Sequence, residues 1–270
     1  MKTVEGQMIE EKHNLQKIGF AFPAGSPHVS RTMMLAELTL LLEYTEELSV
    51  PRSDYVRAIV EDNCLGKRTS KNRLISKRYL VELYALDPNM LIFRALIKFW
   101  KRDKAGHPPL ALLCAYSRDT LLRASAQYII PLSEGTIVNR QSMEDYLDSL
   151  APGRYSQGKL ASNAKNINST WTQSGHLTGR TNKIRTRANP TCGSVAYALL
   201  LGYLTGVRGQ ALFHTEYTKL LDCPFDKATQ LAEEASRKGW IVFKRVGDVM
   251  EVLFPNLINQ EEMEWLREQS

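Results

Sequence analysis

One part of the chain combines many basic residues with a complete absence of acidic ones. The sequence has 29 Asp and Glu in total, yet it has none between Asp148 and Glu216. The basic residues of this segment are Arg154, Lys159, Lys165, Arg180, Lys183, Arg185, Arg187 and Arg208. These eight exceed the formal net charge of the whole chain, +6. Carboxylates repel a polyanion, so their exclusion indicates a surface that lies against one, such as a nucleic-acid backbone.

The segment begins with a predicted amphipathic helix. Ser156 is a suitable N-cap, and Leu160, Ala164, Ile167 and Trp171 recur every three or four residues, as on the buried stripe of a helix. Asn and Gln pair with adenine through two hydrogen bonds, and Lys contacts guanine or phosphate. The helix start carries no acidic residue and so suits a phosphate. The face opposite the apolar stripe, which we expect to meet DNA, presents Lys159, Ser162, Lys165, Asn166, Ser169 and Gln173.

A β-hairpin is predicted to follow this helix. Gly175 ends the helix, and Gly179 lies in a turn between HLT and KIRTR. Strand alternation puts Lys183, Arg185 and Arg187 on one face, with Arg180 at the tip. Four cations beside a groove-reading helix suit contacts to the DNA backbone or minor groove. A solvated basic face without a ligand is the alternative, and the joint absence of acids from helix and hairpin favours binding.

A second basic cluster lies in the N-terminal half. The stretch GKRTSKNRLISKR spans a turn and the start of a helix that follows another short helix, which is helix-turn-helix geometry. Exposed helical faces often carry Lys and Arg, so nucleic-acid contact and plain solvation both remain open here. The candidate contacts of this cluster are Lys67, Arg68, Lys71 and Arg73.

Signatures of catalysis are weak. The chain lacks the glycine-rich phosphate loops, and the S-x-x-K match from Ser156 to Lys159 lacks the companion motifs of acyl-enzymes. The histidines do not have metal-ligand spacing, and we expect His176 to be a surface or hairpin residue. The sequence therefore predicts a non-enzymatic protein without a metal or cofactor.

The pattern of elements predicts a mainly α fold in three parts. Residues 1–31 are expected to form a loosely held extension, 32–150 a helical bundle with helix-turn-helix character, and 151–270 two winged-helix-like units with short β-hairpins. The two units share an order of helix, glycine stop and hairpin. Aligning Gly175 with Gly239 places Ile167 over Leu231 and Trp171 over Ala235.

Composition sets the remaining bounds. The 43% apolar content is that of an ordinary globular protein, and the sequence pI is about 9.1. No run of apolar residues is long enough to span a membrane, and the N-terminus lacks the apolar core of a secretion signal. The four cysteines are widely spaced, as expected for free thiols. These features predict a cytoplasmic protein with no membrane contact.

The chain resembles the BrxA family, a small accessory component of bacterial BREX (bacteriophage exclusion) systems. The resemblance covers roughly residues 32–255, and its motifs are NRLISKRYLVELYAL, CAYSRDTLLRASAQYI, YSQGKLASNAKNINSTWTQSGHL, GYLTGVRGQALF and the closing VLFP. It implies a helical protein with winged-helix character that binds double-stranded DNA. It also implies a role in phage defence beside other BREX components, such as a methyltransferase and an ATPase. Two alternatives stay open: an assembly adaptor that docks protein partners, and an RNA-binding protein.

Overall fold

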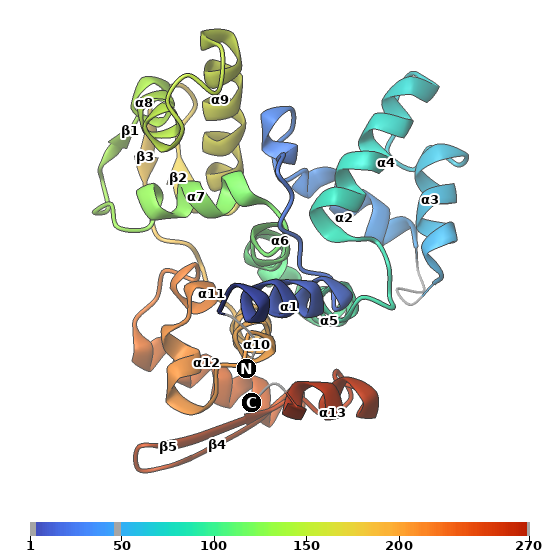
Figure 1. Cartoon of the computed structure of the whole chain (residues 1–270), viewed down its shortest axis with the longest axis vertical. Coiled ribbons are helices and arrows are strands. Elements are labelled where there is room, and N and C mark those ends of the chain that lie inside the picture. Colours follow the sequence, from blue (N-terminus) through green and yellow to red (C-terminus); the bar gives the residue numbers. More distant parts are fainter. Residues whose placement is uncertain (1–3, 46–49, 269–270) are drawn as a thin grey trace.

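The computed structural model describes residues 4–45 and 50–268, and helices dominate it (Figure 1). Helix α10 (Cys192–Leu204) runs through the middle of the molecule, and Val195 to Leu201 are completely buried. A helix that is apolar on all sides must be surrounded by other elements. Around α10 pack α5 (Leu91–Arg102), η2 (Lys104–Gly106), α6 (His107–Tyr116), α11 (Glu216–Lys219) and α12 (Phe225–Arg237).

The N-terminal segment is part of the core, so the expected loose extension over 1–31 is wrong for the residues described. Helix α1 (Val4–Lys17) is followed by buried Ile18 and Phe20, and then by η1 (Pro27–Val29), which packs on helix α9 (Gln157–Gln173). His28 in η1 is completely buried: its Nδ1 lies 2.8 Å from Asp119 Oδ2 and its Nε2 lies 2.9 Å from Thr170 Oγ1. Polar residues between 1 and 31 concealed this anchoring.

Three helices form a separate layer beside this segment: α2 (Leu35–Tyr44), α3 (Arg52–Val60) and α4 (Ser70–Tyr84). Thr69 caps α4, because its hydroxyl oxygen accepts from Asn72 N at 3.2 Å. Helix α2 ends at Tyr44, and residues 46–49 lie outside the described part. Residues 61–69 separate α3 from α4, a longer connection than the three- to four-residue turn of a compact helix-turn-helix.

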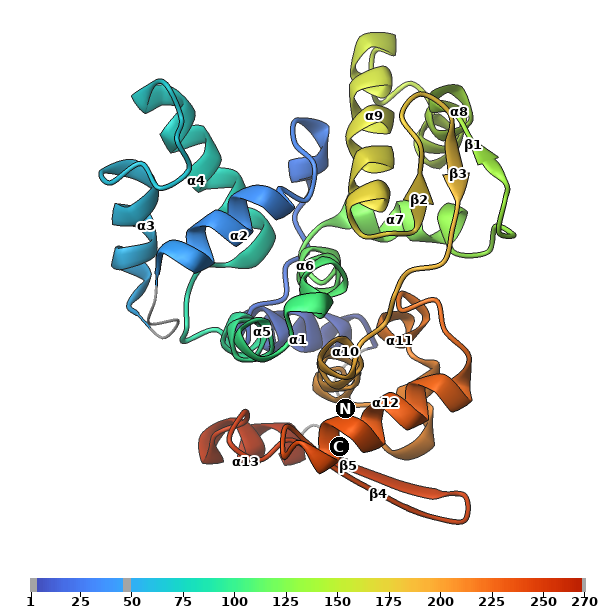
Figure 2. The same cartoon turned by 180° about the vertical axis from the view of Figure 1, so that it is seen from behind.

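A complete winged-helix unit lies at one end of the molecule (Figures 1 and 2). Its strands form an antiparallel sheet in the order β1-β3-β2, in which Ile137 pairs with Ile184 and Leu177 with Arg185. The elements in chain order are α7 (Thr120–Ile129), β1 (Ile137–Val138), α8 (Arg140–Leu150), α9, β2 (Leu177–Thr178) and β3 (Lys183–Arg185). The unit starts near residue 120, so the boundary expected between 150 and 151 cuts through it.

The second unit, built around α10, repeats the order of helices followed by a glycine and a hairpin, but its described sheet has two strands instead of three. Gly175 and Gly239 both have positive φ, 86° and 69°, directly after α9 and α12. After each glycine the chain makes the same bond back into its helix, from His176 N to Trp171 O and from Trp240 N to Ala235 O. The remaining elements of this half are η3 (Gly209–His214), β4 (Val242–Val246), β5 (Val249–Leu253) and α13 (Gln260–Glu268). The predicted fold class is thereby confirmed: mainly helical with short antiparallel hairpins.

Candidate nucleic-acid interface

One face of the N-terminal half of α9 is open to solvent. Lys159, Ser162 and Lys165 are exposed, one helical turn apart, and form no hydrogen bond or ion pair through their side chains with any described residue. Ser156 occupies the N-cap position, but its side chain makes no capping hydrogen bond, and the first turn of the helix contains no acidic residue. This half of the helix therefore presents uncompensated positive charge, as the sequence predicted.

The C-terminal half of α9 is covered, and here the sequence-based assignment was wrong. Asn166 Nδ2 donates to His28 O at 3.1 Å, and Gln173 Oε1 accepts from Leu35 N at 3.3 Å. Gln173 Nε2 also donates to Ser169 Oγ at 3.3 Å. Because residues 28–35 pack on this face, Asn166 and Gln173 are structural contacts, and Ser169 is partly buried beside them.

The β2–β3 hairpin divides its cations between surface and interior. Arg180 is exposed at the turn, and Arg187 is exposed 3.5 Å from Glu134. Lys183 is half-buried and donates to Gly179 O at 2.7 Å. Arg185 has only 3% of its side chain exposed and is bonded to Asp222, so it is withdrawn from any ligand.

Arg185 also shows why alternation along β3 gave the wrong surface. β3 pairs with a strand on each side, so it is the middle strand of its sheet. On the face that carries both Lys183 and Arg185, Arg185 is buried, whereas Lys183 is half-buried and stays partly accessible. Arg185 Nε donates to Ile129 O at 3.1 Å, at the C-terminal end of α7. The apolar Ile184 is instead 41% exposed.

Three of the eight basic residues thus support the fold. Arg185, Arg154 and Arg208 donate to backbone carbonyls: Arg154 Nη2 to Ala24 O at 2.9 Å, and Arg208 Nη1 to Tyr203 O at 2.6 Å, at the end of α10. A cation at a helix C-terminus is favourable on its own and needs no anionic ligand. The exposed positive surface is formed by Lys159, Lys165, Arg180 and, with their partial internal contacts, Lys183 and Arg187.

The second basic cluster is also only partly available. Lys67 pairs with Glu37 at 3.0 Å, and Arg73 Nη1 donates to Val60 O at 3.0 Å, which caps the end of α3. Arg68 and Lys71 are exposed and have no partner among the described residues. Two of the four candidate contacts therefore have structural roles.

A cleft beside the hairpin was missed by the sequence analysis. It has a volume of about 460 Å³ and lies between the start of α8, the middle of α9 and the β2–β3 turn. We call it the basic cleft, and it is lined by Asn139, Arg140, Gln141, Lys165, Asn168, Arg180, Thr181, Asn182 and Lys183. Arg140 precedes the acid-free segment, and it reaches this place because β1 pairs with β3, a contact that local sequence does not reveal.

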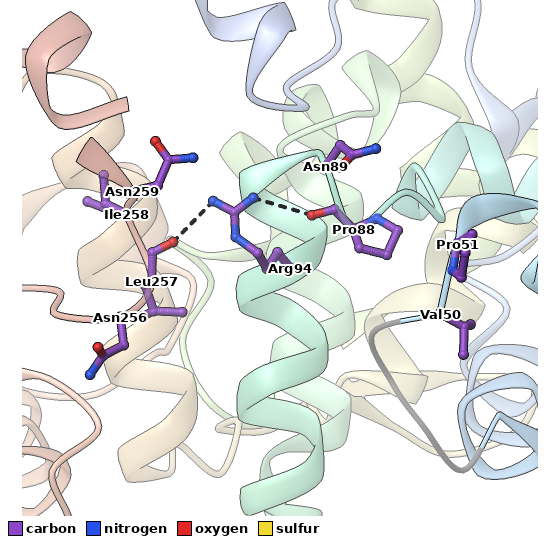
Figure 3. A pocket seen from close by; sticks show the side chains of 9 residues that line it. All are labelled: Val50, Pro51, Pro88, Asn89, Arg94, Asn256, Leu257, Ile258 and Asn259. Atoms are coloured by element: carbon purple, nitrogen blue, oxygen red, sulfur yellow. Dashed lines mark hydrogen bonds between the residues drawn. The ribbon is translucent and has the colours of Figure 1, made fainter. Parts of the chain in front are cut away.

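Another pocket, of about 610 Å³, lies elsewhere, between α5 and the segment before α13 (Figure 3). Its central cation, Arg94, points between Pro88 and Leu257 and donates to the carbonyl oxygens of both (Figure 3). Arg94 also contacts both carboxylate oxygens of Glu262 at 2.7 Å. Its guanidinium is therefore occupied, and we assign this arginine to anchoring the C-terminal helix.

His176 is not the surface residue that the sequence suggested. It is completely buried, its Nδ1 lies 2.9 Å from Ser174 Oγ, and its Nε2 donates to Leu220 O at 2.9 Å. Burial lowers the pKa of His176 to about 4, so the imidazole is neutral and joins the two winged-helix units. The four cysteines are free thiols, as expected.

Among the described residues, no group of three His, Cys, Asp or Glu side chains lies close enough together to hold a metal ion. No helix in the described ranges is long and apolar enough to cross a membrane. Comparison with protein-family models finds no matching family, and comparison with curated proteins finds no match.

Proposed function

We propose that this chain is a non-enzymatic protein that binds double-stranded DNA through α9 and the β2–β3 hairpin. One observation carries the proposal: Lys159, Lys165 and Arg180 are exposed on a winged-helix unit without any anionic partner among the described residues. In helix-turn-helix proteins the corresponding helix enters the major groove. A service in phage defence, beside BREX components such as a methyltransferase and an ATPase, rests on the sequence resemblance.

The covered half of α9 limits which part of the helix can contact a DNA duplex. Since residues 28–35 cover the C-terminal half of α9, the helix can meet a duplex through its first turns, with Ser162 as the side chain that faces the groove. Arg180 and Arg187 then contact the backbone beside it. Arg68 and Lys71, which are exposed on the separate layer of α2, α3 and α4, form a second contact in this proposal.

Salt-dependent duplex binding tests the proposal. The variant Lys159→Ala/Lys165→Ala/Arg180→Ala is compared with Lys219→Ala/Lys227→Ala/Arg237→Ala, which removes the same charge from exposed positions of the second unit. Each phosphate contact contributes about 0.9 to the slope of log K against log salt, so the first variant should lower the slope by roughly 3. Equal binding by both triple variants would refute this placement of the site.

An assembly adaptor is the second candidate, favoured by exposed apolar side chains on the hairpins. Val246 and Val249 are 79% and 73% exposed and face each other across the β4–β5 turn, and Ile137 is 62% exposed opposite Ile184. Exposed apolar pairs of this kind mark contact sites for other proteins. Partner capture that survives nuclease treatment supports the adaptor, and preferential competition by RNA over duplex DNA would make the ligand RNA.

A further inference from the structure

The basic cleft concentrates positive charge from four side chains. Arg140, Lys165, Arg180 and Lys183 line it, and none of the described lining residues is acidic. Arg140 contacts Glu144 of the next helical turn at 2.8 Å, but 65% of its side chain stays exposed. Partial burial lowers the pKa of Lys183, as expected for an ammonium group that has lost water without gaining an anion. A bound anion would relieve this cost.

The start of α8 adds further donors to the same cleft. Asn139 is its N-cap and its side chain accepts from Ser142 N at 2.8 Å. The first turn of a helix leaves backbone N–H groups without intrahelical acceptors, here at Arg140 and Gln141, and both residues line the cleft. The positive end of the helix dipole therefore points toward an anion held there.

Asn168 supplies an independent sign that something belongs in the cleft. It has 5% of its surface exposed and lines the cleft from the middle of α9. Its Nδ2 donates to Asn139 O at a long 3.5 Å, and its Oδ1 has no hydrogen-bond partner among the described residues. Buried polar atoms are normally paired, and this oxygen is an acceptor that no described residue satisfies.

We infer that the basic cleft binds one nucleotide unit, with its phosphate against the four cations and its sugar hydroxyl or base amino group donating to Asn168. The cleft volume of about 460 Å³ is within the range of small-molecule sites. The inference deepens the proposed function, since a strand that crosses α9 and the hairpin passes this cleft. The same chemistry also fits a free nucleotide.

Titration of the full chain with three probes tests the site: 5′-dAMP, deoxyadenosine and pyrophosphate, followed by backbone amide spectra and calorimetry. We expect 5′-dAMP to shift amides of residues 139–141, 165–168 and 180–183. Lys165→Ala should weaken 5′-dAMP and pyrophosphate by about tenfold, the loss of one charge-assisted hydrogen bond. Lys227→Ala, which changes an exposed lysine of α12, should have no effect.

The variant Asn168→Ala tests the contact to the nucleoside independently of the contact to the phosphate. It should weaken 5′-dAMP by roughly three- to tenfold and leave pyrophosphate binding unchanged, because the amide faces the nucleoside. Deoxyadenosine binding as tight as that of 5′-dAMP would overturn the phosphate contact. Scattered amide shifts, or equal losses in Lys165→Ala and Lys227→Ala, would overturn the site. Loss of binding to all three probes in Asn168→Ala, with unchanged amides elsewhere, would overturn the division of roles.

Duplex binding by the same variants distinguishes this inference from the proposed function. If Lys159→Ala weakens duplex binding while 5′-dAMP shows no localised shifts, the DNA surface stands and the nucleotide cleft is wrong. If 5′-dAMP binds as described while the native chain binds no duplex, the cleft stands as a site for free nucleotides and the proposed function is wrong.

Discussion

The guanidinium of Arg185 lies against the carboxylate of Asp222 through two parallel hydrogen bonds, Nη1 to Oδ2 at 2.8 Å and Nη2 to Oδ1 at 2.9 Å. Arg185 belongs to β3 of the first winged-helix unit, and Asp222 follows α11 of the second. Asp222 lies just after the acid-free segment and pairs with the most buried basic residue of that segment. This pair fixes how the two units meet.

Removing one member of this pair should destabilise the protein strongly. Asp222→Asn keeps a residue that tolerates the positive φ of 55° at this position but removes the charge, and leaves Arg185 buried without a counterion. Breaking a buried ion pair typically costs about 3–5 kcal/mol in the free energy of unfolding. Denaturant unfolding of Asp222→Asn and Arg185→Ala checks this, with Arg180→Ala as the exposed control, expected within about 0.5 kcal/mol of the native chain. Equal stability of Arg185→Ala and Arg180→Ala would show that Arg185 is not structural.

The sequence predicted the helices and the repeat well, because both rest on local signals. Helix α9 was recognised from its apolar stripe, and Trp171 and Ile167 are completely buried as expected. The glycines at 175 and 239 marked both helix ends, since a positive φ there favours glycine. Such features depend on neighbours a few residues away.

The binding surface was predicted less well, because exposure depends on contacts between distant residues. Asn166 has the chemistry of a base-reading residue, and nothing near it in the sequence reveals that His28 covers it. Arg185 and Arg73 have the charge of phosphate contacts, but they cap the ends of α7 and α3. Arg140 was overlooked because its neighbourhood includes acidic residues, and it joins the basic cleft only through the β1–β3 pairing.

The covered half of α9 should matter for stability more than for DNA binding. Asn166→Ala removes the hydrogen bond to His28 O and should lower the free energy of unfolding by about 1 kcal/mol. Its duplex affinity should stay within about twofold of the native value, whereas Lys165→Ala should weaken it about threefold or more at low salt. Urea unfolding and duplex titration of both variants measure these effects. A larger loss of affinity in Asn166→Ala than in Lys165→Ala would return Asn166 to the DNA surface.

His176 should make stability depend on pH below neutrality. Its pKa is lowered to about 4 by burial, with Asp222 and Arg185 as the charged groups beside it. Between pH 6.5 and 4 the unfolded chain binds a proton at this histidine that the folded chain does not, so the free energy of unfolding falls as the pH falls. The full contribution is on the order of 3 kcal/mol. Native chain and His176→Gln are unfolded in urea across this range, and the native slope should be the steeper one. Parallel slopes would contradict the buried neutral state.

Three glycine substitutions should separate backbone strain from loss of flexibility. Gly175→Ala and Gly239→Ala force a side chain into the left-handed region at equivalent helix ends, where φ is 86° and 69°, at a cost of about 1–2 kcal/mol each. Neither new Cβ would meet an atom closer than 3.9 Å, so the cost reflects conformation and not a clash.

Gly158→Ala is the matched control, because it lies in the first turn of α9 with ordinary φ and open space, and should stabilise by about 0.4–1 kcal/mol. Thermal or urea unfolding measures all three. We expect Gly158→Ala to raise the free energy of unfolding, and Gly175→Ala and Gly239→Ala to lower it by similar amounts. This result would show that both winged-helix units end their third helix by the same backbone conformation. A loss at one of these glycines alone would contradict the repeat.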